Sequence, residues 1–315
     1  MSPAVDTWRV AAGDAGRRLD HVLAERLDES RSQVASRIRE RRVLLDGAPA
    51  RKSARVEPGQ EISVLAAPPR RAPTPPPVPV RWADEHLAVV AKPAGLVVHP
   101  GAGVTDGTLV DALRAQGLPL ADTGDPERPG IVHRLDRGTS GLLLVASSAA
   151  AVAPLQAAIA ARTVTRRYVA LVDGVPSPAR ATIDAPLARE RARRPRMGLD
   201  PEGRRAITHY DVVETFTGAA RLDVRLETGR THQIRAHLAA IGHPVCGDLA
   251  YGAARERAAW LGLERPALHA ARLTLDHPVT GAPVDVTEPL PADLEAALAV
   301  LRDATDPPAP PDATS

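Results

Sequence analysis

Apolar positions near the start of the chain recur at helical spacing, which predicts two short helices. The first helix is indicated by an apolar face made of Leu19, Val22, Leu23 and Leu27. Ser30 followed by Gln33 has the form of a capping box, in which each residue satisfies a backbone donor of the other. A second helix is therefore expected to start after Ser30 and to bury Val34 and Ile38.

Short apolar runs with strand propensity follow the two helices. Residues 43–45 and 61–65 are predicted strands, and Asp46-Gly47 after the first run is a typical tight-turn pair. We therefore expect a small α/β domain at residues 16–66. Its second helix is crowded with arginines, opposed only by Glu40: Arg31, Arg37, Arg39, Arg41 and Arg42. Such a face indicates polyanion binding, and a solvated basic helix is the alternative.

A proline-rich stretch separates this domain from a longer region of mixed pattern. Residues 67–79 are predicted to be an extended, semi-rigid linker and 304–315 a disordered tail. The region between them, 80–302, predicts strands at 87–90, 142–146, 168–172, 209–214 and 222–226, and helices at 108–114, 151–162 and 231–241. Thr231 is placed to cap the last helix, and Gly242 to end it. Short turns between adjacent strands indicate an α+β domain with a mixed, largely antiparallel sheet.

Composition and charge narrow the classes of protein that these elements can form. Of 315 residues 44% are hydrophobic but only 2% aromatic, so the core must be built from aliphatic side chains. Lys and Arg number 40 against 38 Asp and Glu, yet the chain through Arg71 holds 14 basic and 10 acidic residues. A basic N-terminal piece on a more neutral body suggests an appended polyanion binder. Cys246 is the only cysteine, which excludes an internal disulfide and a cysteine-based zinc cluster.

The sequence predicts neither a membrane span nor a signal peptide. Its most apolar stretch, 142–161, is interrupted by Ser147, Ser148, Pro154 and Gln156. Residues 1–10 lack the charged and apolar regions of a secretory signal. We therefore expect a cytoplasmic protein.

The densest chemical pattern lies in the run from His133 to Gly141. It sets Asp136 between Arg134 and Arg137 on a glycine-punctuated turn that leads into an apolar strand. The two guanidiniums favour the ionised carboxylate and could bring phosphates to it. A permanently charged Asp beside phosphate-binding groups suits nucleophilic attack on a nucleotide. An Asp that caps a turn and pairs with arginine is the alternative at this point.

Three further segments, at 92–101, 226–237 and 269–291, stand in order around this run. Together with residues 133–146 they resemble the motifs of the RluA/RluD family of RNA pseudouridine synthases, with one departure at Gly138, where many members carry Asp. The N-terminal piece resembles the small S-four-type RNA-binding domain that precedes the catalytic domain in RluD-like members. The resemblance implies an isomerase that converts uridine to pseudouridine in structured RNA. Because the reaction neither gains nor loses atoms, no metal or cofactor is expected.

The resemblance also implies roles for single residues. Asp136 would be the catalytic carboxylate, acting on the sugar or on the base. Tyr168 would stack on the target base and take the carbon-5 proton, and Arg230 would pair with the carboxylate. Substrate contacts would come from Arg134, which would hold the flipped base, and from His133, Arg137, Thr139, Leu275, Arg37, Arg41, Arg193 and Arg194. The last two belong to an arginine-rich run, 189–196, expected to be a hairpin that grips RNA, with a solvated loop as the alternative.

Several functional hypotheses stay open at this point. The extension at 99–103 and the N-terminal module favour large-subunit ribosomal RNA as target, with transfer RNA as the alternative. A monomeric enzyme is expected. A non-catalytic RNA-binding or ribosome-assembly factor is a second hypothesis. A metal-dependent hydrolase is a third, disfavoured because the spacings of His232, His237 and His243 do not place two imidazoles on one helical face.

Overall fold

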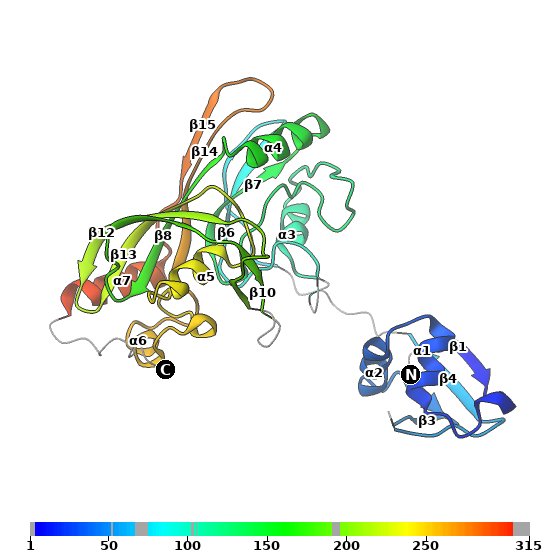
Figure 1. Cartoon of the computed structure of the whole chain (residues 1–315). Helices are drawn as coiled ribbons and strands as arrows, with labels where there is room; N and C mark the ends of the chain where they lie inside the picture. The colour runs from blue at the N-terminus through cyan, green and yellow to red at the C-terminus, as the bar shows by residue number, and fades with distance from the viewer. Residues whose placement is uncertain are drawn as a thin grey trace. The chain divides into compact units, whose positions relative to one another are not determined.

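The computed structural model of the chain describes residues 4–51, 53–66, 75–101, 104, 106–190 and 196–304. The chain divides into two compact units, Met1–Ala72 and Pro73–Ser315, and each has its own hydrophobic core (Figure 1).

The N-terminal unit packs two helices on a four-stranded sheet with the strand order β1-β4-β2-β3. Its elements are β1 Ala4–Arg9, a 3-10 turn Ala12–Asp14, α1 Leu19–Leu27, α2 Arg31–Arg39, β2 Val43–Leu45, β3 Ala48–Pro49 and β4 Glu61–Leu65. The predicted capping box is confirmed, since Ser30 and Gln33 exchange backbone–side-chain hydrogen bonds at the start of α2. Strand β1 was not predicted, and it places ordered structure before residue 16 by pairing with β4.

The tight turn between β2 and β3 has the expected geometry. Asp46 and Gly47 have φ values of 49° and 79°, which is the left-handed pair that a two-residue hairpin turn requires. The buried faces of α1, α2 and the sheet then meet in one aliphatic core: Val10, Leu19, Val22, Leu23, Val34, Ile38, Val43, Val56, Ile62 and Val64.

The C-terminal unit is built on a nine-stranded sheet with the order β5-β6-β7-β14-β8-β13-β12-β9, and β15 pairs with β14. The strands of this unit are β5 Val80–Ala83, β6 Leu87–Lys92, β7 Ser140–Ala146, β8 Thr165–Asp173, β9 Arg180–Asp184, β10 Leu187–Arg189, β11 Met197–Leu199, β12 Ile207–Phe216, β13 Ala219–Leu226, β14 Leu268–Asp276 and β15 Pro283–Thr287. Its helices are α3 Leu109–Ala115, α4 Ala149–Ala161, α5 Gln233–Ala240, α6 Arg255–Trp260, α7 Ala292–Asp303 and a 3-10 turn Leu249–Tyr251. The pairs are antiparallel except β7 with β14, which confirms a mixed, largely antiparallel α+β fold.

Strand β14 holds the middle of this sheet. It lies between β7, which it meets in parallel, and β8, which it meets antiparallel, although it follows both in the sequence (Figure 1). Gly141 allows the close approach, because a Cβ at this position would lie 2.3 Å from the carbonyl oxygen of Ala270. The two halves of the sheet are therefore joined only through β14.

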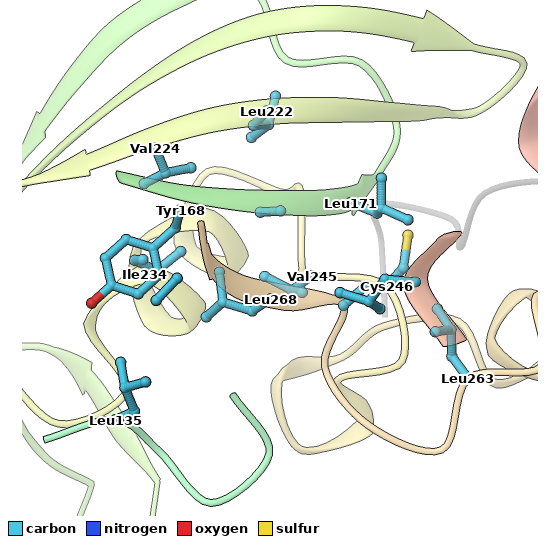
Figure 2. Close-up of a cluster of buried hydrophobic side chains, with 14 of the residues drawn as sticks. Leu135, Tyr168, Leu171, Leu222, Val224, Ile234, Val245, Cys246, Leu263 and Leu268 are labelled. Carbon is cyan, nitrogen blue, oxygen red and sulfur yellow. The ribbon is translucent and has the colours of Figure 1, made fainter. Parts of the chain in front are cut away.

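Two hydrophobic clusters cover the sheet. The larger one receives α3, α5 and α7 through residues such as Leu113, Leu238 and Leu298. The smaller one receives α4 through Ala151 and Leu155. Figure 2 shows part of the larger cluster, which reaches from Leu263 and Cys246 to Leu135 at the edge of the candidate site.

Two sequence predictions need correction at the ends of elements. The second half of the predicted linker, 75–79, packs onto the rest of the C-terminal unit, because Val78 is buried and its backbone N–H and C=O both bind the Gln116 side chain, at 2.8 and 2.9 Å. Residues 67–74, like most of the predicted tail, lie outside the described residues. Helix α5 starts at Gln233, after His232 with φ 54°, so Thr231 does not cap it.

Candidate active site

The loop that carries Asp136 is fixed from both sides of the residue. Leu135 is buried in the larger hydrophobic cluster, and the N–H of Thr139 donates to the carbonyl of Asp136 at 3.1 Å. The carbonyl of Arg137 accepts the N–H of Gly95 at 2.7 Å, which ties the loop to the segment after β6. The carboxylate therefore sits on a backbone that is held in place by packing and by hydrogen bonds.

Lys92 braces the same loop from inside the fold. Its side chain is 1% exposed, and its Nζ donates to the carbonyls of Pro93 at 2.9 Å, Leu96 at 3.0 Å and Arg137 at 3.4 Å. Burial lowers the pKa of Lys92 to about 7, although the nearby carboxylate of Asp136 acts to raise it. This lysine is one of only two in the chain, and the sequence analysis gave it no role.

A pocket opens directly beside Asp136. Its polar wall comes from the loop that carries Asp136, from β8 and from the segment that leads into α5, and its apolar wall from the larger hydrophobic cluster. The lining residues are Arg134, Leu135, Asp136, Thr139, Arg166, Tyr168, Leu226, Gly229, Arg230, Thr231, His232, Gln233, Ile234, Arg235 and Leu268. The structure thus brings together five of the predicted site residues: Arg134, Asp136, Thr139, Tyr168 and Arg230.

The ion pair with the carboxylate is made by Arg235, which corrects the expectation for Arg230. Nη1 of Arg235 lies 3.4 Å from Oδ2 of Asp136, and its other edge binds Asp248 at 2.5 and 2.9 Å. Nε of Arg230 donates instead to the carbonyl of Arg205 at 3.0 Å. The reason is the start of α5: Arg235 lies in the first turn and faces the loop, whereas Arg230 precedes the helix.

Tyr168 forms the apolar side of the pocket. Its ring is 5% exposed and packs beside Ile234, with Leu268 and Leu135 around it (Figure 2). Burial raises the pKa of Tyr168, with Arg166 lowering it and Asp136 raising it further. The hydroxyl is therefore protonated at neutral pH, and it makes no hydrogen bond to another described residue.

A second, open pocket adjoins the first. It shares Gly229, Arg230 and Thr231 with the first pocket and extends to the hairpin of β10 and β11. This hairpin contains the ends of the predicted arginine-rich run, and residues 191–195, with Arg193 and Arg194, lie outside the described residues. The two pockets therefore share one wall, residues 229–231, which lies between the hairpin and Asp136.

Tyr251 connects the hairpin to the carboxylate side of the site. Its hydroxyl accepts the N–H of Met197 at 2.8 Å and lies 3.0 Å from Nδ1 of His232. The guanidiniums of Arg196 and Arg235 each lie 4.8 Å from the ring centroid, which is cation–π distance. Hairpin, tyrosine and Arg235 therefore form one contact chain that ends at Asp136.

Two residues of the 133–141 run, His133 and Arg137, hold the fold and do not line the pocket. Nε2 of His133 accepts the N–H of Leu144 at 3.0 Å, and burial lowers the pKa of His133 to about 3. The neutral ring thus joins the loop to β7. Nε of Arg137 donates to the carbonyl of Gly95 at 3.1 Å, so this exposed arginine is bound to the backbone.

The structure also places three further residues that were predicted to contact the substrate: Leu275, Arg37 and Arg41. Leu275 packs in the smaller hydrophobic cluster, which corrects its expected place under the base. It lies seven residues beyond the pocket residue Leu268 on β14, or about 23 Å along a strand. Arg37 is ion-paired with Glu29, so its charge is already compensated. Arg41, with φ 57°, is exposed after α2.

Arg166, Arg235 and Leu268 line the pocket although the sequence did not predict them there. Arg166 precedes Tyr168 by two positions on a strand, and strand alternation puts both side chains on one face. That spacing was a usable signal. Arg235 stood in a quoted motif, but choosing between its two arginines required the start of α5.

Neither a cluster of metal ligands nor a membrane-spanning helix is present among the described residues. Among them, no three His, Cys, Asp or Glu side chains gather as metal ligands would. His237 hydrogen-bonds to Thr208 and to the carbonyl of Ala185, and His243 to the carbonyl of Asp173, so these imidazoles serve the fold. No helix in the described part of the chain has the length and apolar character needed to cross a membrane.

Comparison with known proteins shows which family the chain resembles. Residues 86–240 match the family model for RNA pseudouridylate synthase, and residues 17–62 match the S4 domain. An uncharacterized RNA pseudouridine synthase of Mycobacterium bovis is 44% identical over 301 residues, covering 93% of this chain and 97% of that protein. The ribosomal large subunit pseudouridine synthase D of Escherichia coli is 39% identical over 311 residues, covering 94% of each chain. The solved human RNA pseudouridylate synthase domain containing 4 aligns with a TM-score of 0.56 at 26% identity, over 71% of this chain and 92% of that one.

Fold, pocket and relatives together define an RNA-modifying isomerase. The chain belongs to the RluA family of RNA pseudouridine synthases and carries an N-terminal S4 domain, which binds RNA.

Proposed function

We propose that this synthase isomerises specific uridines of large-subunit ribosomal RNA, with Asp136 as its catalytic carboxylate. The observation that carries the proposal is the pocket in which Asp136, paired with Arg235, lies beside the ring of Tyr168. Relatives named ribosomal large subunit pseudouridine synthase D, about 40% identical over nearly the whole chain, support the choice of RNA. We expect the enzyme to act as a monomer in the cytoplasm.

The proposed reaction uses the residues of the pocket in sequence. A uridine leaves its stack and enters the pocket, at a cost of a few kcal/mol. Arg134, at the exposed edge, holds the everted nucleotide, and the base stacks on Tyr168. Asp136 then promotes cleavage of the N1–C1′ bond, the base turns, and C5 is joined to C1′. The C5 proton leaves through the Tyr168 hydroxyl, which receives it on oxygen while it gives its own proton to solvent, because burial keeps the phenol protonated.

Tritium release from RNA labelled at uridine C5 tests this proposal. RNA prepared from a strain that lacks the gene is incubated with wild-type enzyme, with Asp136→Asn, and with Asp276→Asn as an exposed carboxylate control. We expect release by wild type and control and none by Asp136→Asn, without added metal. No release by wild type would favour the alternative, a non-catalytic RNA-binding assembly factor.

Mapping of pseudouridines separates the two RNA targets. The same strain should lack modifications in large-subunit ribosomal RNA and regain them on complementation with wild type. If the modifications are missing only from transfer RNA, then transfer RNA is the substrate, and the proposed role of Asp136 is unaffected.

A further inference from the structure

Arg166 is a buried cation without a partner in the wall of the active-site pocket. The residue is 5% exposed, lies on β8 and lines the pocket together with Tyr168. Among the described residues no carboxylate pairs with it, and its Nε is buried without a hydrogen-bond partner. Taking a guanidinium out of water without a counter-charge is strongly unfavourable, so the fold holds this charge at a cost to its own stability.

The surroundings of Arg166 keep its guanidinium open to the pocket. A Cβ at Gly229 would lie 3.1 Å from Nη1 of Arg166, so the glycine leaves room for the guanidinium at this point of the wall. Strand alternation separates it from its neighbour Arg167, which faces the other side of the sheet and is ion-paired with Asp223. Of the two adjacent arginines, only Arg166 lacks a counter-charge.

The pocket is lined by more positively charged than negatively charged side chains. Arg134, Arg166, Arg230 and Arg235 line it, against the single carboxylate of Asp136. Arg235 is neutralised by Asp136 and Asp248, and Arg134 is exposed to solvent at the edge. Of these arginines, Arg166 lies deepest in the pocket, beside Tyr168. A base would enter this part of the pocket, whereas the RNA backbone would stay at its edge.

We infer that Arg166 is a catalytic residue that stabilises the negative charge of the uracil base while the base is detached from the ribose. This inference rests on the proposed function. When the N1–C1′ bond breaks, its electron pair stays with the base, and the charge spreads over N1, O2 and O4. The pair that later forms the C5–C1′ bond comes from the same anion, after which C5 loses its proton and N1 gains one. A buried guanidinium aimed at such a transient anion supplies oxyanion-type stabilisation.

Arg166→Met tests the inference, with Arg167→Met as the matched control. Three quantities are measured: single-turnover tritium release at saturating enzyme on C5-labelled RNA from the deletion strain, the Kd for that RNA, and the thermal midpoint of unfolding. For Arg166→Met we expect release to slow by roughly 10²- to 10³-fold, as when one oxyanion donor is lost. The Kd should stay within about threefold, and the midpoint should be unchanged or higher, because an unpaired buried charge has been removed.

Each of the other possible outcomes would contradict one part of the inference about Arg166. A weakened Kd with an unchanged saturating rate would make Arg166 a phosphate contact, and a lowered midpoint with proportionate loss of activity would make it a packing residue. Arg166→Lys should recover at least about tenfold of the lost rate, since it restores the charge. An active wild type with a fully active Arg166→Met overturns the inference alone, whereas an inactive wild type also removes the proposed function.

Discussion

Arg235 holds the carboxylate of Asp136 with one nitrogen, at 3.4 Å, while its other edge binds the buried carboxylate of Asp248. The shorter distances are those to Asp248, 2.5 and 2.9 Å, so Asp248 sets the orientation of the guanidinium. Asp136 therefore has a charged partner that is fixed from behind, yet its oxygens are not enclosed by that partner. This is a suitable arrangement for a carboxylate that must also meet a substrate.

Removing Arg235 should destabilise the protein as well as inactivate it. Arg235→Met leaves Asp248, 2% exposed, as an uncompensated buried charge, and we expect a loss of about 3–5 kcal/mol in the free energy of unfolding. Urea unfolding followed by circular dichroism measures this. Arg272→Met, which breaks the solvent-exposed pair with Asp285, should leave the stability nearly unchanged. Equal effects of the two variants would contradict the assignment of Asp248 as a buried anchor.

Loss of the Tyr168 hydroxyl should slow the reaction without loosening the fold. The hydroxyl has no partner among the described residues, so Tyr168→Phe should change the free energy of unfolding little. Tritium release should fall by about 10²-fold or more if the hydroxyl takes part in proton transfer. In the control Tyr210→Phe, the hydrogen bond to the carbonyl of Pro178 at 3.1 Å is lost, which costs about 1 kcal/mol without a change in rate. Full activity of Tyr168→Phe would limit this residue to stacking.

The stability contribution of Lys92 should depend on pH in a defined direction. Its pKa is about 7 in the folded state and near 10.5 when unfolded, so between these values the unfolded chain binds the extra proton. Raising the pH from 7 to 9 should therefore stabilise wild type relative to Lys92→Met, by up to about 1.4 kcal/mol per pH unit. Urea unfolding of both proteins at the two pH values measures this difference. A difference that does not change with pH would show that the amine is not desolvated.

Tyr251→Phe should release the hairpin of β10 and β11. The substitution deprives the N–H of Met197 of its acceptor, at an expected cost of about 1 kcal/mol. Trypsin cleavage after Arg196 should then become several-fold faster, whereas Tyr210→Phe should leave this cleavage unchanged. Unaltered cleavage in Tyr251→Phe would mean that other contacts, such as the ion pair of Arg196 with Glu190, hold the hairpin.

Strands that are buried on both faces were predictable, because they appear as unbroken apolar runs. β6 and β7, with every residue buried, are of this kind. The central strand β14 was not predicted, since its sequence mixes His269 and Arg272 with apolar residues and a register shift after Ala270 breaks the alternation. Its central place depends on tertiary pairing that local pattern does not encode.

The candidate site likewise combines residues that the sequence predicted with residues that it did not. A local motif was sufficient to place Asp136 and Thr139 on one loop, and the resemblance placed Tyr168 beside them. The partner of Asp136 could not be read from the motif, because Arg230 and Arg235 differ only in their position relative to the first turn of α5. Leu275 was misplaced for a related reason, since a residue number on a strand does not tell which end faces the pocket.

The place of β14 also sets when the enzyme can become active as it is synthesised. The strand that follows Asp136 and the strand that carries Tyr168 are neighbours only through β14, whose residues leave the ribosome after both. A nascent chain that ends before Leu268 therefore lacks the element that brings carboxylate and phenol together. Such an unfinished polypeptide could hold RNA through its S4 domain, but a reaction that uses Asp136 and Tyr168 as proposed would have to wait until β14 has been translated.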